Sequence, residues 1–298
     1  TGIAFGLAPA LHLSRTTPNE VLKEGGRSGA TGRHAHRWTG GLMVAQPALT
    51  LTLLAGAGFM TRRFLALYHL NIGMDTSNLL TMRVVLSARR YPAFDDLTTF
   101  LRRVDERLNA LSSVDAASTA TSLPLFGLDW RQVLFEGRTL DAGALPPGAI
   151  VISAGPRYFE TVGVGMLRGR SFDEHEGTPG REVAVINERL AALYFPNEDP
   201  IGKRIRFNED IPSGRAWPWA TIVGVAPTVR QRVPQEAAIP DPVVYIPNVQ
   251  HLAHRLGTLI LVRARTDPDP LTQEIRKELS ALDPDLPVGP ELEPAWWE

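Results

Sequence analysis

The sequence predicts an α+β protein in which one transmembrane helix precedes a domain of mixed α/β structure. Two observations support this. Residues 38–61, WTGGLMVAQPALTLTLLAGAGFMT, contain no Asp, Glu, Lys, Arg or His. From residue 79 onward, short apolar runs typical of strands alternate with amphipathic helical patterns. This alternation indicates packed mixed sheets rather than an all-β sandwich.

The uncharged stretch 38–61 has the length of a membrane span. A helix rises about 1.5 Å per residue, so these residues can cross a hydrocarbon core of about 30 Å. A helix also bonds every backbone group within the segment, as lipid requires. The alternatives are a buried helix of a soluble protein and a cleaved signal peptide. Both are weaker, because soluble core helices rarely stay uncharged for so long and no signal cleavage site follows.

The residues before this stretch predict an orientation in the membrane. Residues 1–13 are expected to be the end of a preceding transmembrane helix, and residues 14–37 a basic linker. The linker carries five basic residues, whereas two basic residues directly follow the apolar stretch: Arg15, Lys23, Arg27, Arg33 and Arg37 before it, Arg62 and Arg63 after it. By the positive-inside rule the linker is cytoplasmic and the following domain extracytoplasmic. Because the chain opens on Thr within an apolar run, we expect it to be part of a longer protein.

Residues 62–78 are expected to extend the helix and then turn. The apolar residues Leu97, Leu101, Val104 and Leu108 recur at helical spacing, which predicts an amphipathic helix over 95–111. Its opposite face carries Arg102, Arg103, Asp105 and Glu106, which we assign to a solvated surface. Further helices are expected at 156–162, 187–194 and 270–282. Strands are expected at 79–86, 114–122, 132–136, 150–153, 182–186, 203–207, 219–225, 243–246, 258–264 and 286–288.

Composition excludes several classes of function. The chain has 298 residues, 31 basic and 32 acidic, with a formal net charge of −1. This balance gives no electrostatic signature of a nucleic-acid partner. The chain contains no cysteine, which rules out disulfides and thiolate metal sites.

A search for catalytic and ligand-binding motifs yields no site residues. The phosphate-binding loop GxxxxGK[ST], HExxH and GxSxG are absent. Gly163, Gly165 and Gly169 form GxGxxxG, which is one residue too long for a dinucleotide fingerprint, so they are interpreted as turn glycines. His251 and His254 could approach Glu236 or Asp241, but surface histidines are the better interpretation, as for His175. We therefore predict no catalytic, cofactor-binding or metal residue and no enzyme activity.

Several segments together resemble the MacB/FtsX-like ABC transporter permeases of the duplicated type. Residues 6–27, GLAPALHLSRTTPNEVLKEGGR, resemble the segment that joins the two permease halves, and the helix that follows is similar to the first helix of the second half. Five further segments resemble parts of the periplasmic core of the family: SAGPRYFETVGVGMLRGRSFDEHE (153–176), VAVINERLAALYFPNEDPIGKRIRF (183–207), WATIVGVAPTVR (219–230), PDPVVYIPNVQ (240–250) and LSALDPDLPV (279–288).

This resemblance implies a domain organisation. Residues 79–295 would form a MacB-like periplasmic core domain. Its porter-like part would comprise residues 79–153 and 240–295, with an inserted subdomain at about 154–239. The family has no catalytic residues in this region. The polar stretches 129–145 and 208–217 are candidate loops for contact with a partner.

The resemblance also implies a function. The chain would be a permease subunit fragment in the inner (cytoplasmic) membrane, whose periplasmic domain couples ATP-driven movement to export or release of a substrate. Its partners would be membrane lipid, an ABC ATPase subunit that hydrolyses the ATP, a second permease half or dimer partner, and a periplasmic adaptor. The alternatives are a membrane-anchored extracytoplasmic sensor or binding module without transport activity, and a membrane-tethered enzyme.

Overall fold

The computed structural model describes residues 31–68, 72–86, 89–91, 93–125, 129–138, 146–209, 216–232, 239–250, 258–266 and 270–286. The chain divides into two compact units, residues 1–70 and 71–298. The expectations for residues 1–13 and for residues 14–30 of the linker lie outside the described residues.

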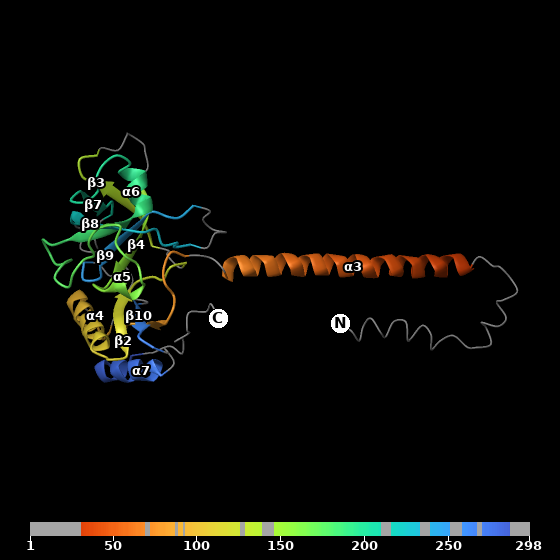
Figure 1. The fold of residues 1–298 in the computed structure, drawn as a ribbon, viewed down its shortest axis with the longest axis horizontal. Coiled ribbons are helices and arrows are strands. Elements are labelled where there is room, and N and C mark those ends of the chain that lie inside the picture. Colours follow the sequence, from red (N-terminus) through yellow and green to blue (C-terminus); the bar gives the residue numbers. More distant parts are fainter. Residues whose placement is uncertain are drawn as a thin grey trace. The chain divides into compact units, whose positions relative to one another are not determined.

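The first unit contains one long helix, α3, which spans Thr31–Tyr68 (Figure 1). The predicted linker is therefore helical from Thr31 onward, where Arg33 to Arg37 include no helix breaker. Pro47 lies inside the helix. Two neighbouring hydroxyls bond back to the helix, Thr50 Oγ1 to the carbonyl of Gln46 and Thr52 Oγ1 to that of Ala48, both at 2.8 Å. These two hydroxyls thus have partners within the helix, as a lipid environment demands.

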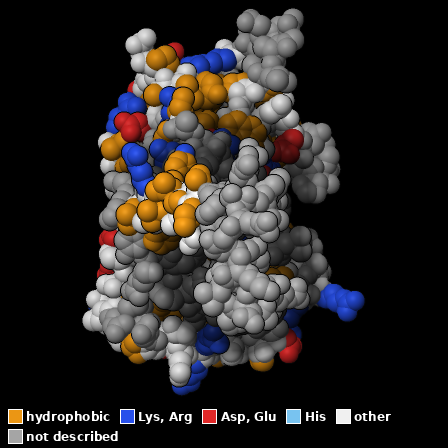
Figure 2. Space-filling model, turned by 90° about the vertical axis from the view of Figure 1, so that its right-hand side faces the viewer, with side chains coloured by type: hydrophobic (Ala, Val, Ile, Leu, Met, Phe, Trp, Pro, Cys, Tyr) orange, Lys and Arg blue, Asp and Glu red, His pale blue; other side chains and the backbone are white. Residues whose placement is uncertain are grey.

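Within α3, the 23 residues Met43–Leu65 are long and apolar enough to cross a membrane. The predicted span, 38–61, overlaps most of this segment. Its large apolar side chains are exposed, with Met43 at 72% and Met60 at 74%. Figure 2 shows exposed groups of hydrophobic side chains in orange. Exposed apolar side chains over this length suit a lipid environment far better than water.

The second unit begins with a three-stranded antiparallel sheet. The strand β10 (Thr258–Ala264) lies between β1 (Leu79–Val84) and β2 (Val114–Ala120). Two amphipathic helices, α4 (Phe94–Asn109) and α7 (Leu271–Leu282), pack with these strands into one hydrophobic cluster. Figure 1 shows both helices beside β2 and β10. In α4 the predicted apolar positions are buried, together with Phe100.

Six of the remaining strands form a closed ring. Its members, in order of pairing, are β3 (Trp130–Phe135), β4 (Gly148–Ala154), β9 (Val243–Pro247), β6 (Val183–Asn187), β8 (Ala220–Ala226) and β7 (Arg204–Phe207), which pairs back to β3. Side chains from all six strands meet in one buried cluster, so the interior of this barrel is packed. The pair Ala120–Ala154 connects β2 to the barrel through β4.

Three short elements complete the fold. The helix α5 (Tyr158–Thr161) packs against β2 and β10, while α6 (Glu188–Tyr194) follows β6. The strand β5 (Arg168–Gly169) pairs with β8 and was not predicted from the sequence. The last predicted strand is not seen at Leu286, and its residues 287–288 lie outside the described part.

The fold class predicted from the sequence is confirmed: one long apolar helix and a mixed α/β domain. The finer subdivision stays a prediction. The barrel combines β3 and β4 from residues 79–153 and β9 from 240–295 with strands from 154–239. Residues of the expected porter-like part therefore share one ring with residues of the expected insertion.

Candidate functional site

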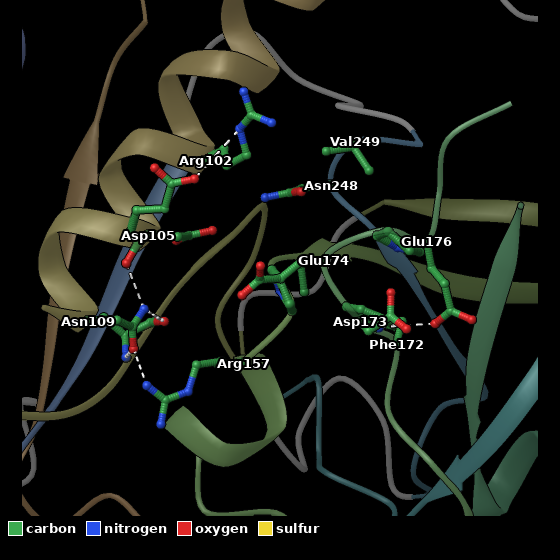
Figure 3. A pocket seen from close by; sticks show the side chains of 15 residues that line it. Arg102, Asp105, Asn109, Arg157, Phe172, Asp173, Glu174, Glu176, Asn248 and Val249 are labelled. Carbon is green, nitrogen blue, oxygen red and sulfur yellow. Dashed lines mark hydrogen bonds and ion pairs between the residues drawn. The ribbon is translucent and has the colours of Figure 1, made fainter.

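A cavity of about 230 Å³ lies between α4 and the loops beyond β4, α5 and β9 (Figure 3). One wall comes from α4, which contributes Arg102, Asp105 and Asn109. The opposite wall comes from residues 172–176 and 247–249. The cavity therefore lies where the helix-covered sheet meets loops attached to the barrel.

Asn109 and Arg157 connect the two sides of this junction. The Nδ2 of Asn109 donates to the carbonyls of Asp105 (2.7 Å) and Ala117 (2.8 Å), and its Oδ1 accepts from the amide of Ala117 (2.9 Å). The same Oδ1 accepts from Arg157, whose Nη2 also donates to the carbonyl of Asp115 at 3.0 Å. Both side chains are thus engaged in hydrogen bonds that hold α4, β2 and the start of α5 together.

Asp105 is the most perturbed titratable group of the cavity wall. Its Oδ1 is inaccessible to solvent and has no hydrogen-bond partner, while its Oδ2 lies 3.5 Å from the donating hydroxyl of Thr119. Burial raises the pKa of Asp105 to about 8, against the opposing effect of the hydrogen bonds from Thr119. The carboxyl group is therefore mainly protonated at pH 7.

The assignment of Asp105 to a solvated surface is wrong. Arg102, Arg103 and Glu106 are exposed as expected, but Asp105 is half-buried and its Oδ1 is inaccessible to solvent. The spacing explains the difference, since Asp105 follows Leu101 by four residues and precedes Leu108 by three. It therefore lies at the border of the apolar face of α4. That spacing was the signal available in the sequence.

The acidic loop opposite α4 is organised by an ion pair. Arg170 donates from Nη1 and Nη2 to the two carboxylate oxygens of Glu176, at 2.8 and 2.6 Å. These hydrogen bonds hold the pKa of Glu176 below its usual value. His175 and Glu174 are exposed, as predicted for His175. No group of three His, Asp or Glu side chains close enough to hold a metal is found among the described residues.

The structure places the other residues considered in the sequence as follows. Gly163 lies in a turn with a φ of 67°, which agrees with its interpretation as a turn glycine. Gly169 has a φ of 69° but belongs to strand β5, and Gly165 lies outside any turn, so that interpretation is wrong for these two. Asp241 is buried and bonds to Arg232, with a distance of 2.9 Å from Nε. His251, His254 and Glu236 lie outside the described residues, as do parts of the two loops expected to contact a partner, 139–145 and 210–215.

Comparison with known proteins identifies the relatives of this domain. Residues 45–278 match the model of the MacB-like periplasmic core domain. A curated relative, the macrolide export ATP-binding/permease protein MacB of Bartonella quintana (strain Toulouse), is 23% identical over 187 residues. The match covers 62% of this chain and 24% of the relative, so the chain spans about a quarter of the relative's length.

Solved structures of periplasmic and extracellular domains are also similar. The periplasmic region of MacB from Actinobacillus actinomycetemcomitans matches with a TM-score of 0.46 and 18% identity, covering 72% of this chain and 88% of that one. The extracellular domain of the transporter YknZ from Gram-positive bacteria has a TM-score of 0.41 and 13% identity, with coverages of 68% and 91%. Since the family model matches well over half of its residues, this chain belongs to the MacB-like periplasmic core domain family of ABC transporter permeases.

Proposed function

We propose that this chain is part of a permease subunit that couples ATP-driven movement across a membrane to export or release of a substrate. The observation that carries the proposal is the order of its parts: the apolar segment Met43–Leu65 lies within the same chain as a MacB-like periplasmic core domain. A helix of this kind anchors the domain and gives it a mechanical connection to the membrane.

ATP hydrolysis would be performed by an ABC ATPase subunit. The relative from Bartonella quintana combines ATP-binding and permease functions, according to its name. The other partners of the proposed permease are membrane lipid, a second permease half or dimer partner, and a periplasmic adaptor. The chain would lie in the inner membrane with residues 79–295 on the extracytoplasmic side, and with 154–239 inserted between the two porter-like segments 79–153 and 240–295.

Two measurements test the proposal. First, the chain has no cysteine, so a single Cys at exposed Lys277 reports the side of the domain. An impermeant maleimide added outside spheroplasts should label K277C before lysis. Labelling that needs lysis would overturn the proposed orientation.

Second, the tagged parent protein, purified in mild detergent, should show ATPase activity that vanadate inhibits. Deleting its gene should change the sensitivity of cells to a macrolide, which is the first compound to test. The chain acts as a sensor or binding module instead if no ATPase activity is retained on the protein and the deletion alters no export.

A further inference from the structure

Residues 72–78, here called the connecting segment, join the domain to the residues that follow α3. Three backbone hydrogen bonds attach this segment to separate parts of the domain. The amide of Arg230 donates to the carbonyl of Ile72 at 2.9 Å, and the amide of Asp75 donates to that of Val162 at 3.2 Å. The amide of Ala264, in β10, donates to the carbonyl of Asn78 at 2.9 Å. The segment is therefore held along its length rather than only where β1 begins.

Arg263 adds a side-chain clamp at the centre of the connecting segment. Its Nε donates to the carbonyl of Thr161, at the end of α5, at 2.8 Å. Its Nη1 donates to Asp75 Oδ2 (3.1 Å) and to the carbonyl of Ser77 (2.9 Å), and its Nη2 donates to the carbonyl of Asp75 (2.7 Å). One guanidinium thus joins β10, α5 and the connecting segment. Its side chain is only 11% exposed, whereas that of Asp75 is 54% exposed, so the guanidinium is shielded from water more than the carboxylate it binds.

Asp75 is prepared for this contact by Ser77. The amide of Ser77 donates to Asp75 Oδ1 at 2.9 Å, and the hydroxyl of Ser77 donates to the same oxygen. These hydrogen bonds, together with Arg263, hold the pKa of Asp75 below its usual value. Asp75 therefore stays ionised at neutral pH, and its second oxygen remains directed to Arg263.

Two glycines allow the connecting segment to approach the domain this closely. A β-carbon on Gly163 would lie 2.8 Å from Asp75 Cβ and 3.0 Å from Arg263 Nη2, and Gly163 has a φ of +67°. A β-carbon on Gly73, at φ +85°, would lie 2.8 Å from the carbonyl oxygen of Thr228. Any side chain at either position would push the segment away from the domain. Gly163 belongs to the GxGxxxG motif, and this contact gives it a role beyond that of a turn residue.

We propose that Arg263 is a positioning residue that fixes the connecting segment to the domain, so that displacement of the chain leaving α3 is passed to β10 and α5. The inference rests on the proposed function, because a clamp at this place matters when the membrane helix and the domain must move together. β10 is the middle strand of its sheet, bonded to both β1 and β2. A force applied at Asp75 is therefore distributed over the sheet and the helices packed on it.

The test uses the full chain in lipid nanodiscs and compares Arg263→Ala with Arg157→Ala. Arg157 is a matched control, because it also makes several side-chain hydrogen bonds but joins α4, β2 and α5 without touching the connecting segment. Hydrogen exchange followed by mass spectrometry should show amides of residues 72–79 exchanging at least tenfold faster in R263A. In R157A these amides should exchange as in the wild type.

A distance measurement tests whether the connecting segment stays fixed to the domain. Spin labels at T76C in the connecting segment and K277C on α7 would be the only labels, since the chain contains no cysteine. We expect a narrow distance distribution in the wild type and in R157A, and a clearly broader one in R263A. Gly163→Ala places a methyl group against Asp75 and should also broaden the distance distribution. This variant replaces R263A in the test if R263A does not fold.

The inference is overturned if the wild-type distribution is already as broad as that of the variants, or if R263A and R157A behave alike in both measurements. Neither measurement requires an ATPase or a substrate. Failure of the clamp would therefore leave the proposed transport function untouched, and failure of the transport assay would leave the clamp in place.

Discussion

The side chain of Asn187 holds the backbone of Val243 at the start of β9, with 2.9 Å between Asn187 Oδ1 and the amide nitrogen of Val243. The same oxygen accepts from the amide of Leu190, 2.9 Å away, and so caps α6. Its Nδ2 donates to the carbonyl of Asp241 at 2.8 Å. One fully buried amide therefore joins the end of β6, the first turn of α6 and the barrel strand β9.

Replacing Asn187 with Ala should destabilise the domain strongly. The change leaves two amides and one carbonyl without their side-chain partner in a dry interior, and each such group costs about 1–3 kcal/mol. We expect a loss of at least about 2 kcal/mol in the free energy of unfolding, measured by urea denaturation. Asn208→Ala removes an exposed side-chain bond to Gln132 and should cost less than about 0.5 kcal/mol. Equal losses in both variants would contradict this account.

Asp105 should make the stability of the domain depend on pH. Burial raises the pKa of Asp105 to about 8, whereas an unfolded chain has an Asp pKa of about 3.9. Between these values the native state holds a proton that the unfolded state has lost, so the free energy of unfolding falls as pH rises from about 4 to 8. The largest slope would be about 1.4 kcal/mol per pH unit.

Thermal unfolding of Asp105→Asn between pH 5 and 9 tests this prediction. The variant carries a neutral group of similar shape, so its Tm should exceed that of the wild type at pH 8.5 and should decline less with pH. Glu106→Gln, at an exposed position on the same helix, serves as the control and should follow the wild type. Parallel curves for D105N and the wild type would show that Asp105 is ionised in the folded protein.

Two glycines of the GxGxxxG motif should respond very differently to the same substitution. Gly169 has a φ of +69°, and a β-carbon there would lie 2.2 Å from the carbonyl oxygen of Val223 across the β5–β8 pair. Gly165 has open space around the position of a β-carbon. Gly169→Ala should therefore cost at least about 2 kcal/mol of stability in urea unfolding, and Gly165→Ala should be nearly neutral. Similar effects would mean that the chain relaxes around residue 169.

A charge in the middle of the apolar segment should impair membrane insertion. Leu54 lies near the centre of Met43–Leu65, where Arg costs about 2.5–3.5 kcal/mol in insertion experiments. Leu54→Arg should reduce the inserted fraction in a glycosylation-based insertion assay. Leu65→Arg, at the end of the segment, should have a much smaller effect because its charge can reach the interface. A buried helix of a soluble protein would give no such dependence on depth.

The sequence was sufficient to locate most elements, because their signals are local. The spacing of Leu97, Leu101, Val104 and Leu108 identifies α4, and the β-branched runs identify strands such as β8 and β10. The order of the strands in the sheet could not be predicted from such local signals. Closure of the barrel depends on β9 pairing in parallel with β4, and nothing in either strand specifies its distant partner.

The features that carry the inferences depended on contacts between distant residues. Arg263 is a charge at the end of an otherwise apolar strand, LILVR, which is a visible anomaly in the sequence. Its meaning appears only when Asp75 and Thr161 lie beside it. Asp105 likewise lies at the border of an apolar helix face, where its Oδ1 is inaccessible to solvent while the next residue, Glu106, is exposed.

The order of strands also constrains the synthesis of this domain. β1 and β2 do not pair with each other, since β10 lies between them, and the barrel closes only through β9. A nascent chain on the ribosome therefore cannot complete either assembly until residues 243–264 have emerged. Such long-range pairing is slow, so apolar strands stay exposed to solvent until their partners have been synthesised. A premature stop before residue 243 should thus yield a substrate for proteases rather than a shortened but folded domain.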